Sequence, residues 1–252
     1  MSKPNILFIF SDQHRGEALG CNGNKVIKTP NLDRIASEGV TFTQCYTNAP
    51  LCMPSRATMM TGQYVREHCM WWNAFALNPE DHPSHVRSIR DAGYHTAQIG
   101  KTHLYMHRAH DNETHSRDYA HILNAWGFED THELHGPKSS ASHSSPYTDF
   151  LTERNLLGTH RDYMWAWNEV KDTGSFGPWE LPPSPLPTDA HLDSYIGNTA
   201  AEWISNYTED QPFYLQVGFG GPHDPFDAPA EFRDLYNPND MSEGIMQAPE
   251  GP

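Results

Sequence analysis

Positively charged residues are scarce in this chain of 252 residues, which has 17 Lys and Arg against 32 Asp and Glu and a formal net charge of −15. A surface this acidic repels other polyanions, so we expect neither nucleic acid nor an anionic membrane as a partner. An anionic substrate would need a local positive pocket inside an acidic molecule. The few basic residues that lie within motifs are therefore the first candidates for function.

Long hydrophobic runs are also absent. Hydrophobic residues make up 37% of the chain, and no run approaches the roughly 20 apolar residues that a membrane-spanning helix needs. The sequence opens with strand-like residues from Asn5, so we expect no signal peptide before the fold. The length suits one large domain or two small ones, and we expect a single domain over residues 1–252.

Cysteine is rare, and its spacing matches neither a zinc site nor a disulfide framework. We interpret the cysteines as thiols in a reducing compartment, which predicts a cytoplasmic protein. They are Cys21, Cys45, Cys52 and Cys69. Histidine is abundant, with 16 residues, but the histidines between 107 and 143 lack regular ligand spacing. We interpret them as solvated side chains rather than zinc ligands.

Strand and helix patterns alternate along the chain. Continuous apolar runs are typical of buried parallel strands, and alternation of apolar and polar residues is typical of strands with one exposed face. The strand patterns lie at 5–10, 40–46, 95–100 and 211–219. The helical patterns lie at 29–39, 52–62, 82–93 and 191–207. This alternation predicts an α/β fold with a mostly parallel central sheet flanked by helices.

Residues 107–190 differ from the rest of the chain. They are dense in His, Ser and Pro, and their periodicity is weak. We expect an irregular insertion there, with long excursions outside the sheet.

Polar clusters follow three of the expected strands. Asp12 and Gln13 follow the first, Lys101 and His103 follow the strand at 95–100, and His223 follows the strand at 211–219. The strand at 40–46 leads into a further motif. Because the carboxyl ends of parallel strands meet at one edge of a sheet, these side chains are expected to converge on one pocket.

That further motif is Cys-Met-Pro-Ser-Arg, which begins at Cys52. A turn-like approach precedes it, and the helical run that follows ends at Gly62. Unpaired backbone N–H groups and the dipole at a helix N-terminus favour an anion, and Arg56 adds a positive fork suited to a tetrahedral oxyanion. Taken alone, a cysteine is more often an inert buried thiol. The Pro, Ser and Arg at this spacing favour a functional one.

The motif resembles the Cys-x-Pro-Ser-Arg signature of type I, formylglycine-dependent sulfatases, which belong to the alkaline phosphatase-like superfamily. Further segments match that family in the right order: NILFIFSDQHR, TPNLDRIASEGVTF, ATMMTGQY, AGYHTAQIGKTHL and PFYLQVGFGGPHDPF. The resemblance implies the family's fold and the hydrolysis of a small sulfated substrate. It also implies a formylglycine-generating or other sulfatase-maturing enzyme as a partner, which would oxidise Cys52 to an aldehyde whose hydrate is the nucleophile.

The same resemblance implies a metal site. Asp12 would ligate a divalent cation, most often calcium, with manganese or magnesium as alternatives. Gln13 stands where many members carry a second aspartate, which removes one negative charge, although an amide oxygen still binds a hard cation. Cys52, once converted, would coordinate the metal through one hydrate oxygen while the other attacks sulfur.

The resemblance also implies roles for the remaining residues. Arg56 would hold the hydrate and its developing charge, and Lys101 and His103 would contact the sulfate oxygens or the hydrate. His223 would donate a proton to the leaving alcohol oxygen and contact the substrate. Asn73 lies near a family asparagine that touches the substrate. Without the resemblance, these loop residues would also suit ordinary turns.

The resemblance covers an N-terminal portion of the family. A Ser-Asp-His/Asn-Gly-type segment, which supplies two further metal ligands in the family, does not occur before Pro252. We therefore expect either a truncated portion of a longer protein or a protein that has lost complete metal coordination, and in both cases the sheet would lack a later strand. We expect the apolar surface left at the sheet to be covered by a partner or by self-association, including a homo-oligomer.

Three functions stay open on the sequence. The first is a formylglycine-dependent sulfate-ester hydrolase. The second is a phosphonate or phosphate ester hydrolase of the same superfamily, for which Gln13 is a hint, although Lys101 and His103 favour sulfate. The third is an inactive, metal-free remnant that folds poorly or binds a partner.

Overall fold

The computed structural model describes residues 3–73, 75–106, 114–173 and 182–241. The chain divides into two units. The larger consists of residues 1–14 and 46–227, and the smaller of residues 15–45 and 228–252. Parts of the expected insertion, at 107–113 and 174–181, lie outside the described residues.

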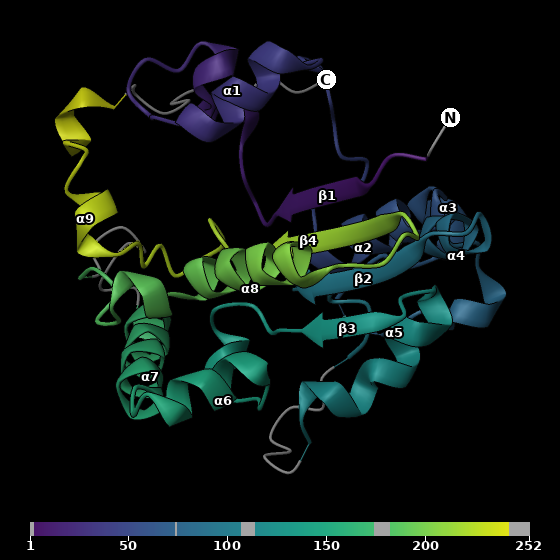
Figure 1. Ribbon diagram of the computed structural model, residues 1–252. Coiled ribbons are helices and arrows are strands. Elements are labelled where there is room, and N and C mark those ends of the chain that lie inside the picture. The colour runs from purple at the N-terminus through teal and green to yellow at the C-terminus, as the bar shows by residue number, and fades with distance from the viewer. Residues whose placement is uncertain (1–2, 74, 107–113, 174–181, 242–252) are drawn as a thin grey trace. The chain divides into compact units, whose positions relative to one another are not determined.

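A four-stranded parallel sheet forms the centre of the larger unit (Figure 1). Its order is β1-β4-β2-β3. The strands are β1 (Ile6–Ser11), β2 (His95–Gly100), β3 (Asp130–Glu133) and β4 (Phe213–Phe219). In the register, Ser11 pairs with Phe219, and Gly100 pairs with both Gly218 and Glu133. The carboxyl ends of all four strands therefore lie at one edge.

Helices cover both faces of this sheet, with α8 on one face and α2 on the other (Figure 1). The helices of the larger unit are α2 (Cys52–Thr61), α3 (Val65–His68), α4 (His85–Asp91), α5 (Ala120–Trp126), α6 (Pro146–Glu153), α7 (Leu157–Thr173) and α8 (Leu192–Asn206). None of the described helices of the chain is long and apolar enough to cross a membrane.

The alternation of side chains along the strands creates two apolar clusters. Leu215 and Val217 of β4 pack in the cluster that includes Ile196 of α8, and Tyr214 packs in the cluster that includes Met60 of α2. Full burial of an aliphatic side chain such as Ile196 contributes about 1.5–3 kcal/mol. These clusters hold the sheet and α2 in fixed relation, which places the strand ends beside the start of α2.

The structure confirms most of the elements that continuous patterns predicted. Three of the four expected strands form, and the helix expected at 191–207 forms as α8 and buries Leu192, Ile196 and Ala200. The strand β1 is less buried than its apolar run indicated. It lies at the edge of the sheet, where Leu7 and Ile9 are 47% and 48% exposed.

The predicted strand at 40–46 is wrong. These residues form no strand in the described structure, and Val40, Phe42 and Tyr46 are exposed. Alternation of apolar and polar residues favours a strand only where a neighbouring strand supplies hydrogen-bond partners. The chain thus reaches Cys52 through an irregular segment.

Residues 114–173 are more regular than their weak periodicity indicated. They contain β3 and the helices α5, α6 and α7. Local capping explains part of this, since Pro146 begins α6 and the Ser145 hydroxyl accepts a hydrogen bond from the Thr148 N–H. One of the histidines expected to be solvated, His135, is buried.

The smaller unit contains the helices α1 (Pro30–Glu38) and α9 (Ala230–Arg233). α1 ends at Gly39 as predicted. The N–H of Lys28 donates to the Tyr236 hydroxyl over 3.1 Å, which ties the two segments of this unit together. All the functional candidates lie in the larger unit.

Candidate active site

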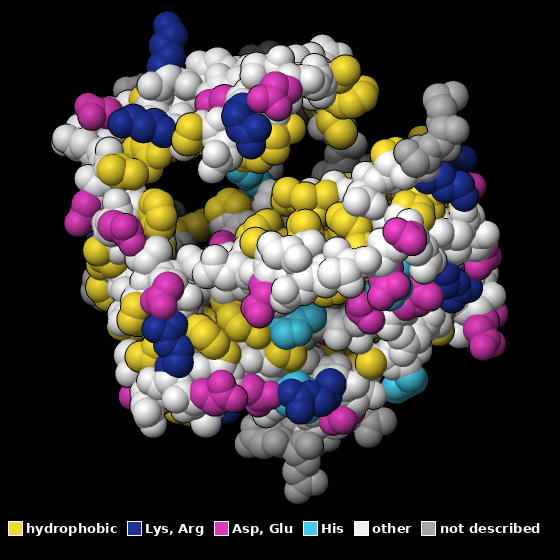
Figure 2. Space-filling model, viewed as in Figure 1, with side chains coloured by type: hydrophobic (Ala, Val, Ile, Leu, Met, Phe, Trp, Pro, Cys, Tyr) yellow, Lys and Arg dark blue, Asp and Glu magenta, His cyan; other side chains and the backbone are white. Residues whose placement is uncertain are grey.

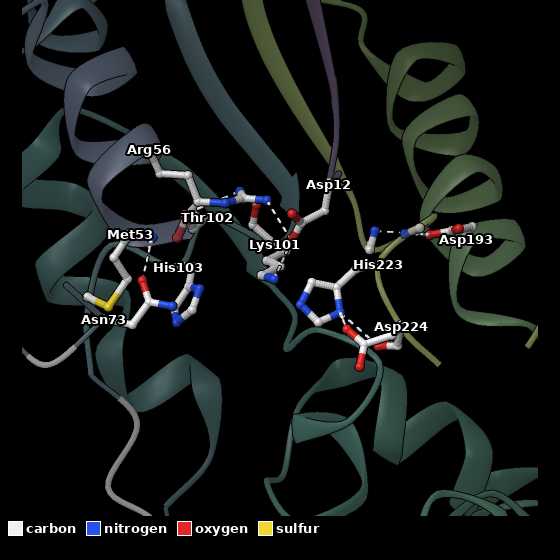
Figure 3. A network of polar contacts seen from close by, with 12 residues as sticks. Asp12, Met53, Arg56, Asn73, Lys101, Thr102, His103, Asp193, His223 and Asp224 are labelled. Atoms are coloured by element: carbon white, nitrogen blue, oxygen red, sulfur yellow. Dashed lines mark hydrogen bonds and ion pairs between the residues drawn. The ribbon is translucent and has the colours of Figure 1, made fainter. Parts of the chain in front are cut away.

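Side chains from three separate segments meet at the carboxyl edge of the sheet, and Figure 3 shows two of them, Asp12 and His223. Asp12 follows β1, Cys52 begins α2 and His223 lies beyond β4. One potential ligand atom from each of these three residues lies within 4.8 Å of the others. Residues far apart in the sequence therefore share one site, as the parallel topology predicted.

Cys52 is the first residue of α2, because Leu51 before it is extended (φ −141°, ψ 143°). The next N–H, that of Met53, donates to the Asn73 side-chain oxygen over 2.9 Å. A hydrogen bond to the His223 ring lowers the pKa of the Cys52 thiol, and the same bond raises the pKa of His223. The start of α2 thus carries a polarised thiol–imidazole pair.

Arg56 lies one turn further along α2 and is almost fully buried. Its Nη1 donates to the carbonyl oxygen of Lys101 over 2.7 Å and to that of Thr102 over 3.4 Å. Its Nη2 lies 3.4 Å from the Asp12 carboxylate, and its guanidinium stacks 4.9 Å from the ring centroid of Phe10. Arg56 therefore joins the ends of β1 and β2 to the signature helix.

Asp12 is a buried carboxylate between two cations. Its Oδ2 accepts a hydrogen bond from the Lys101 ammonium, and Lys101 is itself buried. Burial opposes ionisation of Asp12, but the charges of Lys101 and Arg56 outweigh it and lower the pKa of the carboxyl. Asp12 is therefore ionised at neutral pH.

The loop after β2 approaches β4 closely. Gly100 has φ 98°, and a Cβ atom there would lie 2.1 Å from the carbonyl oxygen of Gly218. His103 also has a left-handed backbone, with φ 53°. Burial, with the charges of Lys101 and Arg56, lowers the pKa of His103 to about 3. The imidazole of His103 is consequently neutral.

Glu133, the last residue of β3, binds the backbone of this loop. Its carboxylate accepts hydrogen bonds from the N–H of Thr102 at 3.0 and 3.1 Å and from the N–H of His103 at 3.3 Å. Burial raises the pKa of Glu133 to about 7, and the loop N–H groups oppose that rise. Sequence reasoning missed Glu133, because no strand was expected at 130–133.

Asp193, near the start of α8, has the same relation to the loop after β4. Its Oδ1 accepts hydrogen bonds from the N–H of Gly220 over 3.0 Å and from the N–H of Gly221 over 3.1 Å (Figure 3). Burial raises the pKa of Asp193. This residue was also missed, since an acidic residue at a helix start is ordinarily a dipole partner.

These segments enclose a cavity of about 130 Å³. Its walls come from α2, the segment at 73 and the ends of β2, β3 and β4. The lining residues are Cys52, Asn73, Lys101, His103, Leu134, His135, Gly136, Pro137, Lys138, Ser139 and His223. This lining includes amines, imidazoles and an amide and no carboxylate, so it suits a small anion although the whole chain is acidic.

The structure brings most of the predicted site residues to this cavity. Five of them, Cys52, Asn73, Lys101, His103 and His223, line it. The segment 134–139 was not predicted, because it belongs to the region interpreted as an irregular insertion.

Asp12 and Arg56 bind Lys101 from behind the lining. Gln13 is exposed with a left-handed backbone (φ 65°). No contact described for its amide connects it to this cluster.

The donor atoms favour a hard cation only in part. Asp12 offers an ionised carboxylate oxygen, which suits calcium, magnesium or manganese. A thiol sulfur at residue 52 is a soft ligand, whereas an oxygen there would match the carboxylate. The residues present therefore fit such a cation better once Cys52 has been oxidised.

Comparisons with known proteins show which sequences this chain resembles. The profile of the family described as Sulfatase matches residues 4–244. An arylsulfatase of Clostridium perfringens is 30% identical over 251 residues, which cover 97% of this chain and 48% of that protein. An N-acetylglucosamine-6-O-sulfatase of Bacteroides thetaiotaomicron is 43% identical over 102 residues, 40% of this chain and 18% of that protein.

A solved structure shares the fold. The phosphonate monoester hydrolase of Agrobacterium radiobacter superimposes with a TM-score of 0.72 at 24% identity, over 96% of this chain and 45% of the other. The chain spans about half the length of the curated relatives that it matches along most of its own length.

Proposed function

This chain belongs to the sulfatase family, and on that premise we propose that the cavity at Cys52 hydrolyses small sulfate esters. The observation that supports the proposal most directly is the meeting of Asp12, Cys52 and His223 within 4.8 Å beside a cavity lined by Lys101. A sulfate group carries the charge and the size that such a lining accepts.

We propose that a formylglycine-generating or other sulfatase-maturing enzyme oxidises Cys52. The resulting group supplies a nucleophilic hydroxyl, and a divalent cation, calcium in the first instance, supplies positive charge beside it. Asp12 and residue 52 would hold that cation, with Gln13 as a further oxygen donor. In the unconverted chain, Asp12 and Gln13 offer oxygen atoms, whereas residue 52 offers a thiol sulfur.

The remaining residues bind the sulfate and handle the proton. Lys101 supplies the positive charge, because neutral His103 can act only as a hydrogen-bond partner to a sulfate oxygen. Asn73, which also lines the cavity, contacts the substrate. His223, whose pKa is raised, gives its proton to the leaving alcohol oxygen.

Arg56 acts through its neighbours rather than on the substrate. It binds the two carbonyl groups of the loop that carries Lys101 and His103. This assignment differs from the direct contact that the family resemblance implied, and it follows from the position of Arg56 behind the cavity lining.

A phosphonate or phosphate ester hydrolase is the second candidate. The similarity of fold to a phosphonate monoester hydrolase favours it, and so does the amide at Gln13. Parallel initial rates on 4-nitrophenyl sulfate and phenyl phosphonate esters separate the two, using the full natural polypeptide co-expressed with a maturing enzyme. We expect the sulfate to react faster, and a faster phosphonate would overturn the first proposal.

An inactive remnant is the third candidate, because the chain spans about half the length of the arylsulfatase that it matches. Calorimetric titration with calcium and with manganese tests it. Saturable uptake by the converted protein supports the enzyme, and no uptake supports the remnant.

The compartment and the assembly also stay proposals. The four cysteines form no disulfide, which supports a cytoplasmic location. The half-exposed Leu7 and Ile9 of edge strand β1 support self-association.

A further inference from the structure

Asp224 binds the ring of His223 with two of its oxygen atoms. The Nδ1 of His223 donates to the carbonyl oxygen of Asp224 over 2.7 Å, and it lies 3.0 Å from the carboxylate Oδ1 of the same residue (Figure 3). Because Nδ1 is turned toward Asp224, the other ring nitrogen, Nε2, lies on the opposite side of the ring. His223 lines the cavity and hydrogen-bonds to Cys52.

The carboxylate of Asp224 is itself held in place. Its Oδ2 forms an ion pair with the Lys138 ammonium. Lys138 lies in the segment after β3, and its ammonium sits 4.2 Å from the ring centroid of Trp167 on α7. Both oxygens of the carboxylate are therefore occupied, one by the imidazole and one by an ammonium on a different element.

The stability of the fold does not explain this arrangement well. The side chains of Lys138, Asp224 and His223 are each about a quarter exposed, at 26%, 25% and 22%. Partly exposed ion pairs of this kind contribute about 0–1 kcal/mol. The backbone of the loop is already held by Asp193 through Gly220 and Gly221. What Asp224 adds is the orientation of one ring.

Resting on the proposed function, we infer that Asp224 is a positioning residue that aims Nε2 of His223 at the leaving-group oxygen. In the step that this serves, a hydroxyl oxygen of converted residue 52 would form a bond to sulfur, while the sulfur–oxygen bond of the ester breaks and its electron pair goes to the alcohol oxygen. That oxygen takes the proton from Nε2, while the other ring proton remains on Nδ1 and is donated to Asp224. The order nucleophile, imidazole, carboxylate is the arrangement by which other hydrolases orient a histidine.

Dependence on the leaving group tests the inference. A nitrophenolate leaving group departs as an anion without taking up a proton, whereas an alkyl leaving group needs a proton on its oxygen to depart. For Asp224→Ala in the full, converted polypeptide, we expect kcat/KM to fall about 100-fold for an alkyl sulfate and to change little for 4-nitrophenyl sulfate, with KM for the latter unchanged. An equal loss on both esters, or no loss on either, would overturn the inference.

Two further variants complete the experiment. Asp224→Asn keeps an oxygen for Nδ1 but loses the charge that binds Lys138, so its loss on the alkyl ester should be smaller than that of Asp224→Ala. Asp189→Ala removes a matched ion pair, with Arg154 at 2.8 Å, and should leave both rates unchanged. If either variant of Asp224 equals Asp189→Ala on the alkyl ester, the positioning role is refuted.

A spectrum of the ring separates this inference from the proposed function. In the unconverted protein, the ¹⁵N signals of His223 should show a proton resident on Nδ1, and Asp224→Ala should shift them toward an exchanging ring. Unchanged signals would refute the inference whatever the enzyme hydrolyses. Absence of sulfate hydrolysis by the wild type, with the expected shift present, would refute only the proposed function.

Discussion

The loop after β2 and the loop after β4 both carry residues of the cavity, but the protein fixes them differently. Lys101 and Thr102 are buried and held from two sides, with their carbonyls on Arg56 and the N–H of Thr102 on Glu133. The loop that carries His223 is fixed at its start by Asp193, and the ring of His223 remains partly exposed.

This difference matches the tasks that we propose for the two loops. Groups that hold a sulfate must keep fixed positions throughout the reaction, and a rigid backbone supplies this. A proton donor needs one correctly directed nitrogen atom, which a single neighbouring residue can supply. In each loop a buried carboxylate replaces water as the partner of backbone N–H groups, which offsets part of the cost of burying it.

The largest effect is expected at Cys52, the first residue of α2, beside which both loops lie. Cys52→Ala removes the thiol that the maturing enzyme would oxidise, and turnover of a sulfate ester should fall about 10⁴-fold or more relative to the converted wild type. Because alanine keeps the helix, the unfolding midpoint in urea should stay near that of the wild type. Substantial turnover by this variant would show that residue 52 is not the nucleophile.

Arg56→Ala should break the first loop while leaving the contacts of the second intact. The substitution removes the donor that binds the carbonyl groups of Lys101 and Thr102, and it removes one of the two positive charges beside Asp12. Loss of one member of a buried ion pair costs about 3–5 kcal/mol of stability. Urea denaturation measures that loss, and turnover should vanish with it. Wild-type stability together with wild-type turnover would contradict the clamp that we assign to Arg56.

A paired substitution sharpens the comparison. Glu133→Gln should loosen Lys101 and His103, so that inorganic sulfate inhibits turnover less strongly, with a loss of stability of about 1–3 kcal/mol. Asp193→Asn should leave inhibition by sulfate unchanged and lower kcat instead. If the two variants weaken sulfate binding equally, sulfate binding is not specific to the loop after β2, and the proposed difference between the loops is wrong.

The smallest expected effect is on the pH dependence of stability. The pKa of Glu133 rises from an ordinary 4.5 to about 7 in the fold, so the native state binds more protons than the unfolded state between those values. This contribution is present below pH 4.5 and is lost as the pH rises through 7. Asp12, whose pKa is lowered from 3.8, acts below this window.

Urea denaturation of the wild type and of Glu133→Gln between pH 5 and 8 checks this sign. The free energy of unfolding of the wild type should fall more steeply with rising pH than that of the variant. Parallel curves would show that Glu133 titrates at its ordinary value.

Local patterns were sufficient to predict much of the framework. The apolar runs of β1, β2 and β4 and the helix between Cys52 and Gly62 depend on neighbours in the sequence, and they formed as expected. The convergence of Asp12 with His223 followed from parallel topology alone. These features could be read from the sequence because each is set by periodicity or by the direction of strands.

Features that depend on tertiary partners could not be predicted in this way. β3 is only four residues long. No sequence pattern in Asp130–Glu133 predicts that the carboxylate of Glu133 accepts hydrogen bonds from the loop after β2. The segment 40–46 had the alternation of a strand but lacks a neighbouring strand in the described structure. From the sequence, Asp193 is an ordinary acidic residue at a helix start, and its hydrogen bond from the N–H of Gly220 depends on tertiary packing.

Joint measurement of conversion and turnover tests the central claim most directly. Preparations of the full polypeptide with different extents of Cys52 oxidation would be assayed on 4-nitrophenyl sulfate, and the aldehyde fraction of the Cys52 peptide would be measured by mass spectrometry. The account predicts a rate proportional to the aldehyde fraction that extrapolates to zero for the thiol form. A rate that does not depend on the aldehyde fraction would contradict it.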